Sequence, residues 1–132
     1  MCNGWLWSYP LFFNNFLIIK NNKFTICWIM LIIFPFIRKF KISGITLFPF
    51  IFLASTEIKQ NNQIVQHEKI HLRQELEMFV VLFYLIYFTE FLVGYIKYND
   101  RYKAYRNISF EREAFDNDFN PDYLKIRRLW SW

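Results

Sequence analysis

The chain contains few of the residues that mark a disulfide-rich or thiolate-bound protein. Its 132 residues include two cysteines, three glycines, four prolines and two histidines. Cys2 and Cys27 both lie in the N-terminal third, without the paired spacing of a disulfide framework or a thiolate metal site. No internal repeat or low-complexity linker interrupts the chain, and its length suits one domain.

Hydrophobic and aromatic residues are unusually frequent for a water-soluble domain. They make up 55% and 23% of the chain, and 17 residues are phenylalanine. The formal net charge is +5, and the basic residues are spread along the chain rather than gathered in one tract. We therefore expect anionic membrane lipid as the counter-surface, and no nucleic-acid partner.

Two apolar runs, residues 5–19 and 24–37, fill the N-terminal part. Each is shorter than the roughly 20 residues that span a bilayer, so they predict a hairpin, an interfacial anchor or one imperfect span. No basic residue precedes the first run, which argues against a secretory signal. Residues 1–40 are thus predicted to be a membrane-associated segment, or a non-native extension from a wrongly chosen start codon, and residues 41–132 a separate domain.

Residues 41–132 predict a mixed α+β domain that is mainly helical. Residues 41–55 indicate one bent strand or a strand pair, with Pro49 favouring an edge position. A helix is predicted over residues 60–77, where no glycine or proline occurs. A last functional helix is predicted over residues 110–119, with Ser109 as its N-cap.

The apolar run of residues 78–96 is just long enough to span a bilayer. Basic residues flank it on both sides, contrary to the positive-inside bias, so a helix packed in the protein or lying at the interface is at least as well supported. Glu90 within the run predicts the polar edge of an interfacial helix, in preference to a functional buried carboxylate. The basic, tryptophan-tipped residues 123–132 also suit a membrane interface.

The segment His67-Glu68-Lys69-Ile70-His71 contains both histidines of the chain. Side chains four residues apart project from nearly the same side of a helix, so His67 and His71 can bind one metal ion. Glu68 can then accept a proton from a metal-bound water, which is the arrangement of HExxH zinc hydrolases. The alternative is two solvated histidines on a helix surface.

A catalytic zinc ion needs a third protein ligand, which must be a carboxylate because no third histidine exists. Glu111 lies near the centre of an apolar arc on the predicted last helix, where a buried charge needs a partner. Glu113 points about 160° away, on a face with the pattern of a solvated surface. We therefore predict Glu111 as the third ligand and keep Glu113 as the alternative.

The order HEKIHLRQE, a long apolar segment and SFEREAFD resembles the gluzincin side of the zincin metallopeptidases. In style it is similar to membrane metallopeptidases of the beta-lactam sensor and CAAX-protease kinds, and to small uncharacterised bacterial HExxH proteins. The resemblance covers residues 41–132 and implies a zincin-like domain with Zn²⁺ as cofactor. An E-x-x-A-like motif in several of those families implies Glu111 as ligand, with Ala114 following. Phe115 stands where they often have Asp or Asn.

Supporting roles are indicated less specifically. Glu75 or Asp118 could orient a histidine ring, although a surface carboxylate is the favoured interpretation of each. A tyrosine could donate a hydrogen bond to a developing oxyanion, and the candidates are Tyr102, Tyr105 and Tyr123.

The function predicted from the sequence is zinc-dependent hydrolysis of peptide bonds at or near a membrane, with a bacterial inner membrane as the expected location. The partners would be a peptide or protein substrate and membrane lipid, and the strand near residues 45–52 could pair with an extended substrate. Two alternatives stay open. One is a non-catalytic membrane protein with structural zinc, and the other is a lipid-binding interaction protein in which the motif is coincidental.

Overall fold

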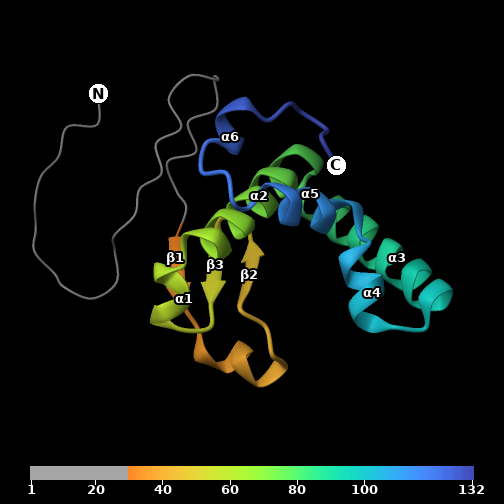
Figure 1. The fold of residues 1–132 in the computed structure, drawn as a ribbon, viewed down its shortest axis with the longest axis horizontal. Coiled ribbons are helices and arrows are strands. Elements are labelled where there is room, and N and C mark those ends of the chain that lie inside the picture. The colour runs from red at the N-terminus through yellow and green to blue at the C-terminus, as the bar shows by residue number, and fades with distance from the viewer. Residues whose placement is uncertain (1–29) are drawn as a thin grey trace, which may run out of the picture.

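A computed structural model of the chain describes residues 30–132. It contains a three-stranded sheet and a larger helical part (Figure 1). The mainly helical α+β class predicted from the sequence is therefore confirmed. The run of residues 5–19, the start of the second run and both cysteines lie outside the described residues.

The sheet has the strand order β1-β3-β2, so β2 is an edge strand. Strand β1 (Met30–Ile33) pairs parallel with β3 (Phe50–Leu53), and β2 (Gly44–Leu47) pairs antiparallel with β3. The predicted strand pair is thus present. Pro49 lies in the turn between β2 and β3 rather than in an edge strand, contrary to the prediction.

The first strand comes from the apolar segment that the sequence grouped with residues 1–40. It is followed by η1 (Pro35–Phe40), a 3-10 helix that leads back to β2. The backbone of Phe34 also bonds the sheet, because its N–H donates to the carbonyl of Leu53. The described part of that apolar segment therefore belongs to the same sheet as the predicted strand pair.

The helix with both histidines is α2 (Asn62–Met78), which confirms the helix predicted over residues 60–77. A short helix, α1 (Thr56–Gln60), precedes it. Asn61 separates the two, and its side chain accepts hydrogen bonds from the first backbone N–H groups of α2. This N-cap fixes where α2 begins.

The apolar run forms α3 (Val80–Tyr98), which is long and apolar enough to cross a membrane. Phe79, with φ 61°, separates it from α2, so the chain turns instead of continuing as one helix. Much of α3 is exposed, including Val81, Leu85 and Val93. Its other face packs on α4 (Arg101–Arg106), and the two extend away from the sheet in Figure 1.

The predicted last helix is α5 (Ser109–Asn117), and its start differs from the prediction. Ile108, not Ser109, is the N-cap residue and it gives no side-chain cap. Instead the carboxylate of Glu90 accepts hydrogen bonds from both the backbone N–H and the hydroxyl of Ser109, at 2.6 and 2.8 Å. Glu90 of α3 therefore accepts a backbone hydrogen bond at the start of α5, a role that its interfacial interpretation did not include.

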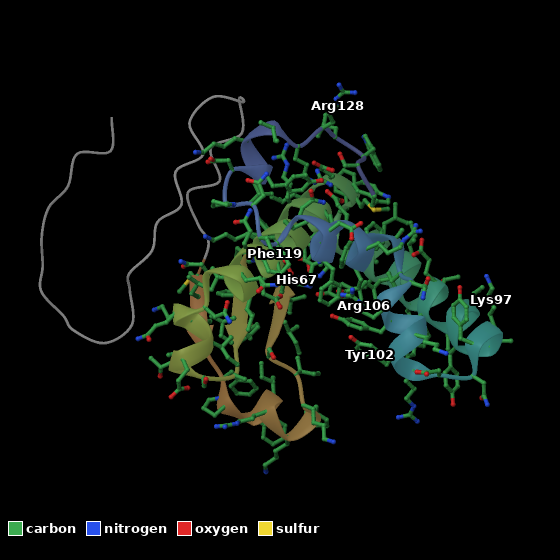
Figure 2. The ribbon with its side chains drawn as sticks, viewed as in Figure 1. His67, Lys97, Tyr102, Arg106, Phe119 and Arg128 are labelled. Atoms are coloured by element: carbon green, nitrogen blue, oxygen red, sulfur yellow. The ribbon has the colours of Figure 1, made fainter. Side chains whose placement is uncertain are left out.

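Helix α2 lies between the sheet and α5. Its sheet side adds Val65 to a core formed with Ile51 and Leu53, and near its end Met78 joins a second core with Phe110. The short helix α6 (Tyr123–Ile126) leads into the C-terminal residues. Figure 2 shows Arg128 of this segment on the outside of the molecule, whereas Arg127 is buried, as described below.

Candidate metal centre

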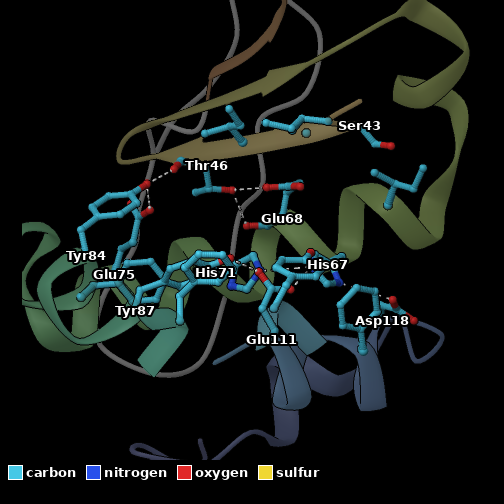
Figure 3. A pocket seen from close by; sticks show the side chains of 18 of the residues that line it. Ser43, Thr46, His67, Glu68, His71, Glu75, Tyr84, Tyr87, Glu111 and Asp118 are labelled. Atoms are coloured by element: carbon cyan, nitrogen blue, oxygen red, sulfur yellow. Dashed lines mark hydrogen bonds and ion pairs between the residues drawn. The ribbon is translucent and has the colours of Figure 1, made fainter. Parts of the chain in front are cut away.

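Three buried side chains from two helices meet where α5 packs on α2. His67 and His71 lie one turn apart on α2, and Glu111 comes from the first turn of α5 (Figure 3). Glu111 is only 3% exposed. The structure thus brings together the three residues that the sequence predicted as ligands, in a group that could hold a metal ion.

The distances among the three side chains suit one small ion. The Nε2 atoms of His67 and His71 are 3.1 Å apart, and each lies 3.2 or 3.3 Å from an oxygen of Glu111. Two atoms bound to zinc at about 2.1 Å and at the tetrahedral angle would be about 3.4 Å apart. The donor set, two imidazoles and a carboxylate, is also one that zinc accepts in catalytic sites. The residues present therefore fit a zinc ion.

The histidines and the carboxylate shift each other's pKa. Burial opposes a charge on His71, but the carboxylate of Glu111 outweighs it and raises the pKa of His71 to about 9. Burial likewise opposes the charge on Glu111, yet both histidines together hold the pKa of its carboxyl well below the usual range. A metal ion bound here would replace the proton that now offsets the carboxylate.

Asp118 lies beside the outer nitrogen of His67. Its Oδ2 is 3.4 Å from His67 Nδ1, and its Oδ1 accepts a hydrogen bond of 3.1 Å from Gln63. Asp118 is buried, so it is not the surface carboxylate that the sequence favoured. Phe115 packs edge-on against the His67 ring at 4.5 Å and makes no such bond itself. A carboxylate beside a ligand histidine fixes the ring that it contacts.

Glu75 contacts neither histidine, contrary to its suggested role. It is fully buried, and its carboxylate accepts hydrogen bonds from the backbone N–H of Phe48 at 2.7 Å and from the hydroxyl of Tyr84 at 2.9 Å. Glu75 thereby ties the turn after β2 to α2 and α3. The surface interpretation is wrong for this residue too.

Glu68 projects from α2 toward β2 (Figure 3). The hydroxyl of Thr46 lies 2.6 Å from Glu68 Oε2, and a Cβ atom added to Gly44 would lie 2.5 Å from Glu68 Oε1. Burial raises the pKa of the Glu68 carboxyl. Thr46 and Gly44 thus set the position of this carboxylate, and no motif in the sequence indicated either of them.

Glu113, the alternative ligand, does not belong to the metal group, and it is buried, contrary to the predicted solvated face. Arg127 bonds its carboxylate through Nε at 2.5 Å and Nη2 at 3.1 Å, and the Tyr123 hydroxyl donates to it at 2.7 Å. Burial would raise the pKa of the Glu113 carboxyl, but the bonds from Arg127 and Gln74 hold it below its ordinary value. The C-terminal segment therefore covers Glu113, whereas Arg112 and Asp116 on the same side of α5 stay exposed. The Tyr123 hydroxyl is bonded to Glu113 rather than to the metal group.

An open cavity of about 930 Å³ joins the metal group to β2. Its wall includes Tyr102 and Tyr105, as predicted, and also Tyr84 and Tyr87 of α3, which the sequence did not single out. The Tyr87 hydroxyl donates to Glu111 at 2.7 Å. Figure 2 shows Tyr102 at the outer end of α4, away from His67, whereas the Tyr105 ring packs edge-on against Phe115, which contacts the His67 ring.

Strand β2 offers a free edge to this cavity. The carbonyl of Ser43 accepts a hydrogen bond from the backbone N–H of Ala54 on the sheet side. Backbone groups alternate in direction along an antiparallel strand, so those of Gly44 and Thr46 point away from β3. The hydroxyl of Tyr84 donates to the Thr46 carbonyl, in agreement with that direction. The backbone N–H and carbonyl of Gly44 and the N–H of Thr46 have no partner on the sheet side.

Comparisons of the chain with family models, with curated proteins and with solved structures find no match.

Proposed function

We propose that this chain is a zinc-dependent metallopeptidase that hydrolyses peptide bonds at a membrane. The observation that carries the proposal is the junction of α2 and α5, where His67, His71 and Glu111 approach each other at distances suited to one ion. Three protein ligands leave the fourth tetrahedral position for water, which is the pattern of catalytic rather than structural zinc sites. Bound zinc would act as a Lewis acid and lower the pKa of a water ligand to about 7.

Glu68 is the general base in this proposal. It follows the first ligand directly in the sequence, and it lines the same cavity as the ligands. Its carboxylate would take the proton from the attacking water and pass it to the leaving amine. Thr46 holds one carboxylate oxygen by its hydroxyl, so the base is positioned before substrate arrives.

The free edge of β2 would hold the substrate. An extended peptide can add to an exposed sheet edge through main-chain hydrogen bonds, which gives binding with little dependence on side chains. The unpaired groups of Gly44 and Thr46 lie on the wall of the same cavity as Glu68. Peptide bound there would present a backbone carbonyl between the base and the metal ligands.

The proposed membrane location rests on the exposed side of α3. Large apolar side chains stay exposed along its length, among them Leu85, Phe88 and Val93. Phe88 also lines the cavity, so the apolar surface and the site are continuous. The three-residue site and this surface together favour a peptidase that meets its substrate at the lipid boundary, and a bacterial inner membrane is our proposed location.

The test is the substitution Glu68→Gln, with Glu57→Gln as its matched control. Glu57 is exposed on α1, so the control makes the same chemical change away from the cavity. Each protein is loaded with zinc in lipid micelles and given a peptide library, and cleavage is read by mass spectrometry. We expect the wild type and Glu57→Gln to cut, and Glu68→Gln to bind one zinc ion but to lose cleavage by a factor of at least about 100.

The outcomes separate the alternatives. Zinc binding without cleavage by the wild type would favour the non-catalytic zinc protein. Vesicle binding without any zinc binding would favour the lipid-binding interaction protein. Cleavage that survives in Glu68→Gln would refute the mechanism while leaving the metal group in place.

A further inference from the structure

Gln74 connects the second histidine to the far side of α5. Its side chain is fully buried, and its Oε1 lies 2.7 Å from His71 Nδ1. Its Nε2 donates at 3.1 Å to the carbonyl of Phe110 and at 2.9 Å to the carboxylate of Glu113. The Gln74 amide is therefore within hydrogen-bond distance of a partner at both of its ends.

The partners determine which way the amide must point. A backbone carbonyl and a carboxylate held by an arginine can only accept hydrogen bonds, so the end of Gln74 that faces Phe110 and Glu113 has to be its NH₂ group. The end that faces His71 is then the carbonyl oxygen, which can only accept. The hydrogen of that contact must come from Nδ1 of His71.

From this chain of donors and acceptors we infer that Gln74 is a positioning residue, which keeps the hydrogen of His71 on Nδ1 and leaves Nε2 for the metal ion. The inference rests on the proposed zinc site, since it names what prepares one of its ligands. His71 thus has a neutral amide as its partner, whereas His67 has the carboxylate of Asp118.

The buried ion pair of Arg127 and Glu113 belongs to the same network. Arg127 holds the Glu113 carboxylate, and Glu113 in turn accepts from Gln74. The C-terminal segment is thus joined to His71 by a continuous path of hydrogen bonds through Glu113 and Gln74.

The test compares Gln74→Met with Gln66→Met. Gln66 is also a buried glutamine of α2, but its amide donates to the Asn120 carbonyl and does not line the cavity. Zinc affinity is measured by competition with a chelator, on protein shown by urea unfolding to be folded. We expect Gln74→Met to weaken zinc binding by about 10- to 100-fold, and Gln66→Met to leave it within about twofold of the wild type.

A spectroscopic measurement adds a result that does not depend on zinc affinity. The chain has only two histidines, so two-bond ¹⁵N–¹H correlation spectra show only two rings. We expect the zinc-bound His71 ring to carry its hydrogen on Nδ1, and in Gln74→Met we expect that one ring alone to change.

Each result decides something specific. A His71 ring bound to zinc through Nδ1, or equal zinc affinity in folded Gln74→Met and wild type, would overturn the inference. If the wild type binds no zinc, the proposed function fails, and the positioning role of Gln74 fails with it.

Discussion

The substitution Gly44→Ala tests whether the position of Glu68 matters for catalysis. Gly44 has no positive φ, so alanine brings no backbone strain and changes only the space beside the strand. The new Cβ atom would lie 2.5 Å from Glu68 Oε1 and 2.8 Å from its Cδ. Ordinary contacts begin at 3.4 Å, so the carboxylate has to move by about 0.9 Å.

That displacement is large for catalysis and small for stability. A misplacement of about 1 Å can cost about 100-fold in rate, because the reacting groups no longer meet in line. The atom that moves is the end of a flexible side chain, and the metal ligands do not touch Gly44. We therefore expect kcat/KM for cleavage of library peptides to fall by about 100-fold, with zinc affinity unchanged.

Gly94→Ala is the matched control for this change. Its Cβ atom would contact Ala104 at 3.2 to 3.3 Å where α3 crosses α4, and Gly94 does not line the cavity. This variant should cut at the wild-type rate. Wild-type cleavage by Gly44→Ala would refute the role given to Glu68, and loss of zinc from Gly44→Ala would show that β2 supports the metal group rather than the base.

Two further substitutions test the scaffold and the surface. Arg127→Met should lower the free energy of urea unfolding by about 3–5 kcal/mol, because it leaves the buried carboxylate of Glu113 without a cation, whereas Glu77 keeps its ion pair with Arg73; a loss below about 1 kcal/mol would contradict that reasoning. Val93→Glu should weaken flotation with vesicles of neutral and anionic phospholipid by about tenfold, since Val93 is 60% exposed on α3. The same change at Ile126, exposed on α6, should leave flotation unaltered, and equal losses at both sites would argue against α3 as the lipid-facing helix.

Much of the metal group could be predicted because helical periodicity is local. The spacing of His67 and His71 places both on one side of any helix, and Glu111 stands out because it interrupts an apolar face. Both arguments need only the order of the residues within one helix. The meeting of α2 and α5 could be expected only from the chemistry, since a buried carboxylate needs a cation.

The supporting residues could not be predicted because their partners are distant in the sequence. Glu113 has the pattern of a solvated residue because its partner, Arg127, comes from the C-terminal segment. The long helices α2 and α3 separate α5 from β2 in the sequence. Thr46 and Gly44 gain their roles only when the sheet packs on α2. The sequence predicts Glu90 as the polar edge of an interfacial helix, whereas its carboxylate accepts a hydrogen bond from the start of α5. These contacts depend on tertiary packing, for which local patterns carry no signal.

The most direct test of the account is zinc titration of the metal-free protein, with Glu111→Gln and Glu113→Gln compared. Both variants replace one buried carboxylate of α5 by an amide of the same shape. We predict one zinc ion per wild-type chain, retention of that ion by Glu113→Gln, and a loss of affinity in Glu111→Gln beyond the roughly 100-fold that removal of an outer partner costs. A wild type that binds no zinc, or zinc that stays in Glu111→Gln and leaves Glu113→Gln, would contradict the account.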